Sequence, residues 1–525
     1  MRIGEDLESA ADARPQKMAL VVGARRVGYG ALHAAVQALA RRLRGVGVGA
    51  GERVVVCIAD PVLYAVALHA VLASGATFVP LPATARAPRI AFALRDVRAR
   101  LLLSEPGLRA VWGEALAKLG FDRLSPNGSE EGSADPQLWP AGIDDLSFAA
   151  CTLRPPAAPH DLAAPPADLA CILYTSGTTG VPKGAMLTHA GMRAAWDMVQ
   201  AYLGLRSDDV IALPLAPTFS YGLYHVLMGL GLGATIVCEP AAQAFPRALL
   251  QRLVAERATV LPGVPMLFAQ LLGQAASGAF DLGALRTVTN AAAALPPAHL
   301  ERLATLLPRA RVLSMYGMTE CKRISWLPPE EITRRPASVG RGLAGQQHWL
   351  VDETGQRLAP GFESAGELVV RGPHLMAGYW ERPAETAERL VASDDGPCLH
   401  TGDLFRADAD GFLHFVARRD DIIKSRGEKV APREVESVIC TLAGVREAAV
   451  AGVPDAMLGQ AVVAYVVPEP GAVLEARQVI RHCLAGLEPH MAPKEVRFVR
   501  ELPRTDSGKL RRADLAAAWA QDNAA

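Results

Sequence analysis

The sequence predicts an α/β protein with a large N-terminal domain of layered α/β subdomains and a small, mobile C-terminal lid domain of α+β type. Apolar runs of strand length alternate with helical patterns through the first two thirds of the chain, which is typical of helices packed on a largely parallel sheet. With 525 residues, the chain is too long for one ordinary domain. The composition also changes near residue 417, where charged residues and glycine concentrate before a short αβ segment.

The N-terminal elements follow from the length and flanks of these apolar runs. We expect strands at 53–59 and 76–81, with a helix at 64–75 between them. The apolar stretch from Leu223 to Cys238 contains tyrosine, histidine and three glycines, so we interpret it as a buried helix leading into a strand rather than as a membrane span. A second helix is expected at 245–258.

Two further regions complete the expected organisation. Residues 121–166 are rich in proline, alanine and glycine, which indicates a surface connection. The C-terminal segment predicts two strands and two helices; the helices are expected at 434–442 and 476–487, and the strands at 447–453 and 461–467.

The overall composition excludes several classes of protein. Lysine plus arginine equals aspartate plus glutamate at 54 each, so net charge gives no reason to expect a nucleic acid or an anionic membrane as partner. The first 16 residues carry acids and lack an apolar core, unlike a signal peptide. The eight cysteines are scattered without a C-x-x-C pair, which favours a reduced, cytoplasmic location over a disulfide framework or a zinc ribbon.

The run TSGTTGVPKG at 175–184 has no large side chain and follows a short apolar strand. Glycines allow close backbone approach, while hydroxyls and bare N–H groups form a nest for anions to which a lysine adds positive charge. The order of residues differs from the Walker pattern, because glycine follows the lysine. We therefore predict that a polyphosphate binds here, through Thr175, Ser176, Gly177, Thr178, Thr179, Gly180 and Lys183.

The chain as a whole resembles the adenylate-forming superfamily, which includes acyl-CoA synthetases, adenylation domains of peptide synthetases and luciferases. The loop is followed, in that family's order, by four further motifs: YGMTE at 316–320, HTGDL at 400–404, RRDDIIKSRGEKVAPREVE at 418–436 and PRTDSGKLRR at 503–512. The resemblance implies a carboxylate that attacks the α-phosphate of ATP and releases pyrophosphate. A thiol then displaces AMP. The expected cofactors are ATP, Mg²⁺ and either coenzyme A or the pantetheine arm of a carrier protein.

The resemblance assigns roles to the motif YGMTE. Tyr316 flanks the adenine, Thr319 offers its hydroxyl to the α-phosphate, and Glu320 holds Mg²⁺, which prefers oxygen ligands. On the residues alone, this motif could equally be the start of a helix with a glutamate in its first turn.

Later motifs imply a nucleotide site and a moving domain. Asp403 would accept the ribose hydroxyls, and a hairpin after it would deliver Arg418 to the same nucleotide. Asp420 stands at the family's hinge, which implies an adenylation domain at 1–419 and a mobile lid at 420–525.

The lid would serve both half-reactions. Lys509 would bridge the carboxylate and the α-phosphate during adenylation, which makes it the main catalytic candidate. After rotation of the lid, the stretch containing Lys424 and Gly427 would face the incoming thiol.

The acid is expected to bind between the phosphate loop and YGMTE. No carboxylate stands near residue 219 to pair an α-ammonium, which disfavours amino acids as substrates. The methyl groups of the alanines at 291–293 and the side chain of Met315 narrow the expected pocket. We therefore expect a small to medium apolar monocarboxylate, aliphatic or aryl. Lys322 and Arg323 are expected to be structural or on the surface, although a second carboxylate or a hydroxyl could use them. The pocket candidates are Phe219, Ser220, Tyr221, Ala291, Ala292, Ala293, Ser314 and Met315.

The sequence leaves alternatives for the acceptor thiol and for the reaction. We favour coenzyme A, and the alternatives are a stand-alone ligase that loads a separate carrier protein and, less favoured, an amino-acid adenylating enzyme. A luciferase-like oxygenase would use the same motifs. A non-enzymatic nucleotide-binding scaffold is disfavoured because Thr319, Glu320, Asp403 and Lys509 are all present.

Overall fold

The computed structural model describes most of the chain. The described residues are 2–119, 136–140, 143, 147–153, 166–175, 182–238, 246–275, 280–291, 295–359, 361–425, 428–455, 457–504 and 510–522. These residues belong to two compact units. The first comprises 1–336, 342–346 and 371–397, and the second 337–341, 347–370 and 398–525. The predicted boundary at residue 420 lies within the second unit and stays a prediction.

The first unit contains a sheet built largely from parallel strands near the N-terminus. Its strands β4, β3, β5 and β8 pair in parallel, as the alternation of strands and helices predicts. The order is β19 (Gly378–Tyr379), β9 (Lys183–Thr188), β8 (Leu169–Thr175), β4 (Thr77–Leu81), β3 (Arg53–Cys57), β5 (Leu101–Ser104), β7 (Ser147–Thr152) and β6 (Pro136–Pro140).

The strands β6 and β7 were not predicted, because the region 121–166 was interpreted as a connection alone. Strand β7 is mostly buried and pairs with β5 in antiparallel orientation. Its sequence SFAACT is a short apolar run without the alternation that marks a strand with one exposed face. The rest of that region lies mainly outside the described residues.

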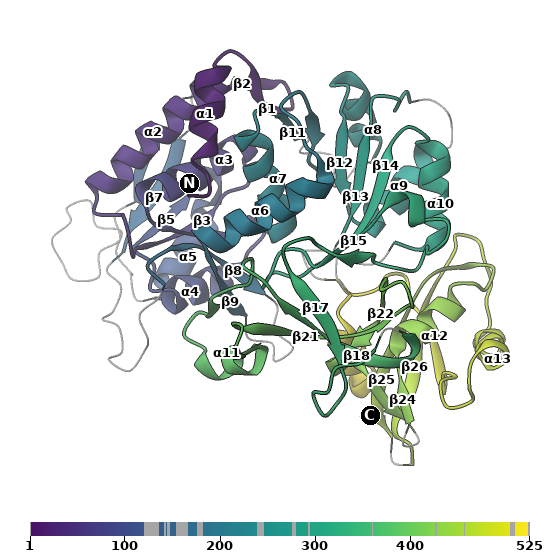
Figure 1. Ribbon diagram of the computed structural model, residues 1–525. Helices are drawn as coiled ribbons and strands as arrows, with labels where there is room; N and C mark the ends of the chain where they lie inside the picture. Colours follow the sequence, from purple (N-terminus) through teal and green to yellow (C-terminus); the bar gives the residue numbers. More distant parts are fainter. Residues whose placement is uncertain are drawn as a thin grey trace. The chain divides into compact units, whose positions relative to one another are not determined.

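A second sheet of the first unit carries the long parallel series. In Figure 1, helices α8 and α9 lie beside its strands. The strand order is β15 (Ser325–Leu327), β14 (Arg311–Tyr316), β13 (Thr287–Asn290), β12 (Val260–Gly263), β10 (Val210–Ala212), β11 (Thr235–Cys238), β1 (Met18–Val22) and β2 (Arg25–Gly28). Strands β14, β13, β12, β10, β11 and β1 are all parallel to their neighbours in this series.

Helices of the first unit cover these sheets. Helix α3 begins where Asp60 accepts hydrogen bonds from the N–H groups of Val62 and Leu63, and it ends at Gly75, whose φ of 88° favours glycine. The helices are α1 (Asp6–Ala13), α2 (Tyr29–Gly45), α3 (Pro61–Ser74), α4 (Ala87–Asp96), α5 (Arg109–Ala117), α6 (His189–Leu203), α7 (Ser220–Gly231), α8 (Pro246–Ala255), α9 (Pro265–Ala275), α10 (Pro297–Leu306) and α11 (Pro383–Arg389). Short elements are η1 (Pro106–Leu108), η2 (Pro329–Glu331) and β20 (Leu390–Val391), and β16 (Arg341–Gly342) lies where the units meet in sequence.

The second unit holds two smaller sheets. In one, β17 (Gln347–Val351), β18 (Gly361–Arg371), β21 (Cys398–Ala407) and β22 (Leu413–Arg418) are neighbours in that order. In the other, the order is β24 (Glu428–Val430), β23 (Ile423–Ser425), β26 (Gly459–Pro468) and β25 (Val445–Asp455), with β27 (Glu495–Phe498) pairing with β26. The helices are η3 (Arg419–Asp421), α12 (Pro432–Ile439), α13 (Ala476–Gly486) and α14 (Arg512–Asp522). The predicted C-terminal strands and helices are confirmed.

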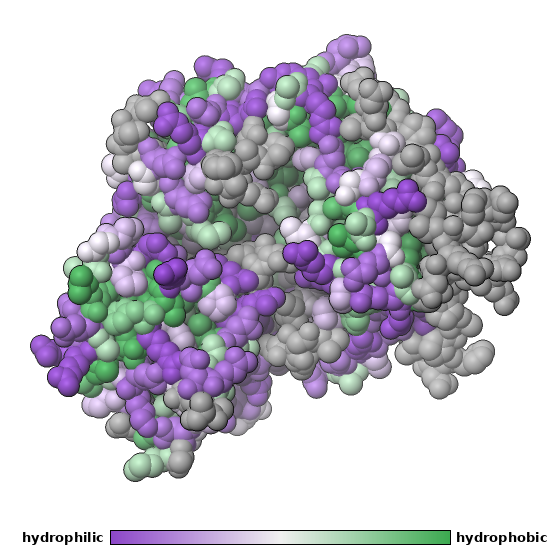
Figure 2. Space-filling model, turned by 180° about the vertical axis from the view of Figure 1, so that it is seen from behind, coloured by the Kyte–Doolittle hydropathy of each residue, from purple (hydrophilic) through white to green (hydrophobic). Residues whose placement is uncertain are grey.

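The surface mixes residue types. Figure 2 shows a face on which hydrophilic residues cover most of the described surface and hydrophobic residues gather in smaller areas between them. Among the described residues, no helix is both long and apolar enough to cross a membrane.

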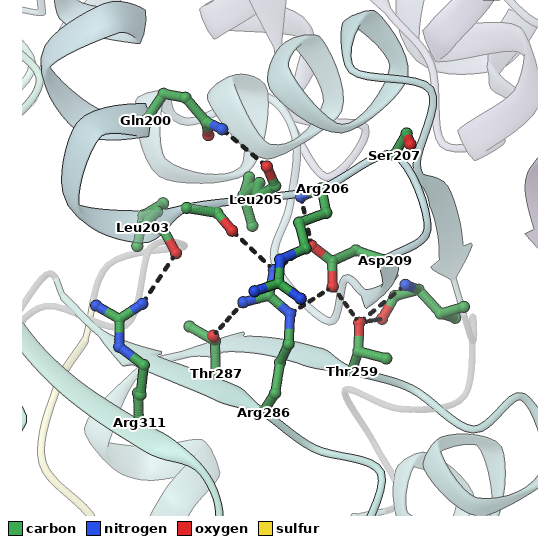
Figure 3. Close-up of polar contacts among 12 residues, drawn as sticks. Gln200, Leu203, Leu205, Arg206, Ser207, Asp209, Thr259, Arg286, Thr287 and Arg311 are labelled. Atoms are coloured by element: carbon green, nitrogen blue, oxygen red, sulfur yellow. Dashed lines mark hydrogen bonds and ion pairs between the residues drawn. The ribbon is translucent and has the colours of Figure 1, made fainter.

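A polar network fixes the amino-terminal ends of the parallel strands in the second sheet (Figure 3). The buried carboxylate of Asp209, just before β10, accepts hydrogen bonds from Arg286 Nε at 2.7 Å and from the hydroxyl of Thr259 at 2.7 Å. The N–H of Arg206 donates to it at 2.7 Å. Because Thr259 and Arg286 directly precede β12 and β13, this carboxylate joins three strand ends.

We expect Asp209→Asn to lower the thermal midpoint of unfolding by roughly 4 °C, because it removes the charge that pairs Arg286. Burial alone would raise the pKa of Asp209, but the hydrogen bonds from Arg286, Thr259 and Arg206 hold it below the ordinary value. A lowered folded-state pKa contributes stability above the unfolded value, about 3.9, that is lost as the pH falls through the folded value. Calorimetry across acid pH should therefore show a smaller pH dependence for the variant. Exposed Asp208→Asn is the control, and equal midpoints for the two variants would contradict this role.

Candidate functional site

The carboxyl ends of the parallel strands in the second sheet converge on one edge. Gly263 at the end of β12 pairs with Asn290 at the end of β13, which pairs with Ser314 near the end of β14. Ala291 follows directly and is buried. In open α/β sheets, ligands bind outside this edge.

Helix α7 begins beside this edge with three of the predicted pocket residues. Phe219 is the residue before the helix, and both Ser220 and Tyr221 lie in its first turn. The hydroxyl of Tyr221 donates to the carbonyl oxygen of Thr289 at 3.0 Å and lies 2.6 Å from the Thr289 hydroxyl. The structure therefore brings Tyr221 to the end of β13, where the sequence predicts a wall of the acid pocket.

Other predicted wall residues differ in their surroundings. Met315 is 4% exposed, and its sulfur accepts a hydrogen bond from the Tyr202 hydroxyl at 2.9 Å. Tyr202 stacks on Trp326 with ring centroids 4.9 Å apart, so Met315 contributes to packing against α6 and β15. Ala292 and Ala293 lie outside the described residues.

A tight turn follows β14 and carries Thr319 and Glu320. The N–H of Ile324 donates to the carbonyl oxygen of Tyr316 at 2.9 Å, which closes the turn. A Cβ on Gly317 would lie only 2.3 Å from the carbonyl oxygen of Lys322, so this position requires glycine. The turn is a closed loop here, rather than the helix start that the residues alone allow.

Glu320 is buried, and a tyrosine orients its side chain. One carboxylate oxygen accepts a hydrogen bond from the Tyr379 hydroxyl at 2.7 Å, and the main-chain carbonyl oxygen accepts one from the N–H of Met376 at 2.7 Å. Tyr379 lies in β19, opposite Ala185 of β9. Sequence reasoning missed Tyr379; the signal was the pair Tyr379–Trp380, two large aromatics after a glycine.

The strands β8 and β9 form the two arms of the predicted phosphate loop. Thr175 pairs with Lys183 across the arms, and residues 176–181, which include Ser176, Gly177, Thr178, Thr179 and Gly180, lie outside the described residues. The ammonium of Lys183 is 5.7 Å from the ring centroid of Tyr379. Tyr379 thus connects the base of the loop with Glu320.

The surroundings of Glu320 fit a magnesium ion. Among the described residues, only Tyr379 donates a hydrogen bond to its carboxylate, to Oε1, so the other oxygen is available. No cluster of three or more histidine, cysteine, aspartate or glutamate residues occurs in the described part of the chain. Mg²⁺ commonly binds through one or two carboxylates together with substrate phosphates.

Lys322 and Arg323 are not on the surface, which corrects one of the two expectations for them. They are 5% and 4% exposed. Lys322, together with Thr319, Tyr224, His374 and Leu375, lines a small recess in the first unit.

In the second unit, the predicted hairpin brings Asp403 and Arg418 together. They are opposite residues of β21 and β22, and Arg418 Nε donates to Asp403 Oδ1 at 3.1 Å. Glu367 of β18, missed from the sequence, accepts a hydrogen bond from the N–H of Gly402 at 2.8 Å and pairs with Arg419. Burial would raise the pKa of Glu367, but hydrogen bonds from His400 and Gly402 hold it below its ordinary value. Glu367 therefore stabilises the turn before Asp403.

The remaining predicted residues lie in the C-terminal segment of the second unit. Asp420 is exposed in η3, and Lys424 is exposed in β23. Gly427 and Lys509 lie outside the described residues. On either side of Lys509, the backbones of Arg504 and Leu510 form an isolated β-bridge, and Arg512 forms an ion pair with Glu436.

Comparison with known proteins decides the family. A model described as AMP-binding enzyme matches residues 7–380, and one described as AMP-binding enzyme C-terminal domain matches residues 434–509. The chain belongs to the AMP-binding enzyme family. This confirms the resemblance to the adenylate-forming superfamily that the motifs predicted.

Relatives of this AMP-binding enzyme cover almost its whole length. It is 32% identical to a feruloyl-CoA synthase of an Amycolatopsis species, over 95% of this chain and 96% of the relative. It is 31% identical to an oxalate–CoA ligase of Arabidopsis thaliana, over 97% of each. The crystal structure of ATP-bound MatB from Rhodopseudomonas palustris, 29% identical, superposes with a TM-score of 0.83 over 99% of both chains. The predicted α/β fold class is confirmed.

We expect Tyr379→Phe to lower the rate of acyl-adenylate formation about tenfold and to raise the Mg²⁺ concentration needed for half-maximal rate, because Glu320 loses the hydroxyl that orients it. A magnesium titration of pyrophosphate release checks this. Tyr465→Phe, which removes a buried hydroxyl in the second unit, is the matched control. An unchanged magnesium requirement in Tyr379→Phe would contradict the orienting role.

Proposed function

We propose that this protein activates a small to medium carboxylic acid, whose acyl group is mainly apolar, to an acyl-adenylate and then transfers the acyl group to coenzyme A. The acid binds at the carboxyl edge of the second sheet, against Tyr221 and Ala291. The observation that carries the proposal is the link from Glu320 through Tyr379 to Lys183, because it joins the predicted magnesium ligand to the predicted phosphate loop.

The reaction class follows from the family. The chain is an AMP-forming acid–CoA ligase: it is similar over nearly its full length to several CoA ligases, and both family models match. ATP, a carboxylic acid and coenzyme A are therefore its substrates. A carrier-protein pantetheine is the alternative acceptor, because it presents the same thiol.

Each unit supplies groups for part of this chemistry. In the first unit, the loop from Thr175 to Lys183 would bind the β- and γ-phosphates, and Thr319 would donate its hydroxyl to the α-phosphate. Glu320 would hold Mg²⁺, which supplies charge neutralisation on the phosphates when it is bound. Tyr316 would lie against the adenine.

The second unit would contribute to nucleotide binding and to both transfers. Asp403, oriented by Arg418, would accept the ribose hydroxyls. Lys509 would stabilise the charge that develops between carboxylate and α-phosphate. Motion of a lid at 420–525 about Asp420 would then bring Lys424 and Gly427 to the thiol.

A cytoplasmic location is part of the proposal. All eight cysteines are described and none forms a disulfide. Disulfides are rare in cytosolic proteins, so this supports a reducing compartment.

The test is a screen for pyrophosphate release over a panel of acids, with coenzyme A or a carrier protein as acceptor.

We expect Lys509→Ala to lower acyl-adenylate formation by a factor on the order of 10²–10³, because the charge at the reacting oxygens loses its cation. The variant should still convert supplied acyl-adenylate to thioester, since that step does not use the lysine. The exposed Lys494→Ala on the same segment is the control. Wild-type adenylation by Lys509→Ala would overturn the assignment.

A further inference from the structure

Two buried basic side chains of the turn that carries Thr319 have no acidic partner among the described residues. Lys322 and Arg323 are adjacent in sequence, are 5% and 4% exposed, and form no ion pair with any described residue. The nearest acid in sequence, Glu320, instead binds the Tyr379 hydroxyl. A buried charge without a counter-charge is strongly unfavourable, so such residues require an explanation.

Lys322 is held in place by one hydrogen bond and by aromatic rings. Its ammonium donates to the carbonyl oxygen of Ser220 at 2.9 Å. It lies 4.4 Å from the ring centroid of Tyr224 and 5.4 Å from that of Tyr221. An ammonium has three donors, and only one of them has an acceptor among the described residues. The side chain is therefore positioned but incompletely satisfied.

Arg323 approaches the same tyrosine. Its guanidinium carbon is 5.2 Å from the ring centroid of Tyr221, and it interacts with the hydroxyl of Tyr202. The Nε atom is fully buried and has no hydrogen-bond partner in the described chain. A guanidinium presents its donors in a planar fork that suits a carboxylate.

The surroundings do not neutralise this charge. Burial, together with the charges of Lys322 and Arg323, lowers the pKa of His225 to about 3, so the imidazole stays neutral. The part of this shift that Lys322 and Arg323 cause reflects positive charge that no described acid balances, and a bound anion would balance it.

We propose that the acid activated by this enzyme carries a second carboxylate, which binds to Lys322 and Arg323 while the first is adenylated. This inference rests on the proposed function. The sequence predicts an apolar monocarboxylate as the substrate. We infer instead a small dicarboxylic acid, whose remaining carbon skeleton contacts Tyr221 and Tyr224. Thr319, proposed to contact the α-phosphate, belongs to the same closed turn as Lys322 and Arg323, so the proposed site for the second carboxylate lies beside the reacting groups.

The test compares α,ω-dicarboxylic acids, from malonate to suberate, with their monomethyl esters. Each ester keeps one carboxylate for adenylation and blocks the other without shortening the chain. Pyrophosphate release gives kcat/KM for every acid. For the diacid that reacts best, we expect kcat/KM to exceed that of its ester by on the order of 100-fold, because the ester leaves the buried cations unpaired.

Variants of Lys322 and Arg323 test whether these two side chains cause the preference for the diacid over its ester. Arg323→Gln and Lys322→Met should each reduce kcat/KM for the diacid at least about tenfold and leave that for the ester nearly unchanged, whereas Arg323→Lys should retain part of the preference. The exposed Arg41→Gln on α2 is the control. As a second measurement, the diacid should raise the thermal midpoint of the wild type and of Arg41→Gln, but not that of Arg323→Gln.

The outcomes separate the two proposals. If monocarboxylic acids or esters release pyrophosphate as efficiently as diacids, or if the variants lose both substrates equally, the second-carboxylate inference is wrong and the proposed ligase stands. If no acid in a broad panel releases pyrophosphate from ATP, the proposed function fails, and the inference fails with it.

Discussion

The parallel alignment of β10, β12, β13 and β14 determines where chemistry can take place in the first unit. The carboxylate of Asp209 ties the amino-terminal ends of β10, β12 and β13, and the carboxyl ends of β12, β13 and β14 meet at one edge in a fixed register. That register places the end of β13 beside α7 and the turn after β14. The register therefore brings groups that are far apart in sequence to one edge of the sheet, where ligands bind in open α/β sheets.

The second constraint is electrostatic. Adenylation brings together a carboxylate and a polyphosphate, so cations must be present before the reactants meet. The first unit contains Lys183 near Tyr379, as well as the buried side chains of Lys322 and Arg323. A charge that costs stability in the free protein can be retained when its partner is a substrate, as we propose for Lys322 and Arg323.

Much of the fold and the family could be predicted from the sequence, because apolar runs and motif order are local properties. The helix and strand between 223 and 238 and the C-terminal αβ segment were predicted for this reason. Strand β7 was missed because its six residues lack alternation and lie in a proline-rich region. A short strand buried on both faces has no periodicity that separates it from a loop.

The site was predicted less completely, because contacts between distant segments are invisible in one sequence. Tyr379 and Glu367 act through the groups they orient, Glu320 and the turn before Asp403, and the local sequence does not show which distant groups they contact. The burial of Lys322 depends on the turn that closes over Gly317, where the left-handed φ of 65° at Lys322 is a property of the fold and not of residue type.

The central claim is that a carboxylate oxygen attacks the α-phosphate of ATP. It is tested most directly by supplying an acid labelled with ¹⁸O in both carboxylate oxygens, together with ATP and coenzyme A, and analysing the products by mass spectrometry. The account predicts one ¹⁸O atom in each AMP and none in pyrophosphate, since the oxygen that forms the anhydride leaves with the nucleotide. Label in inorganic phosphate with formation of ADP, or AMP without label, would contradict it.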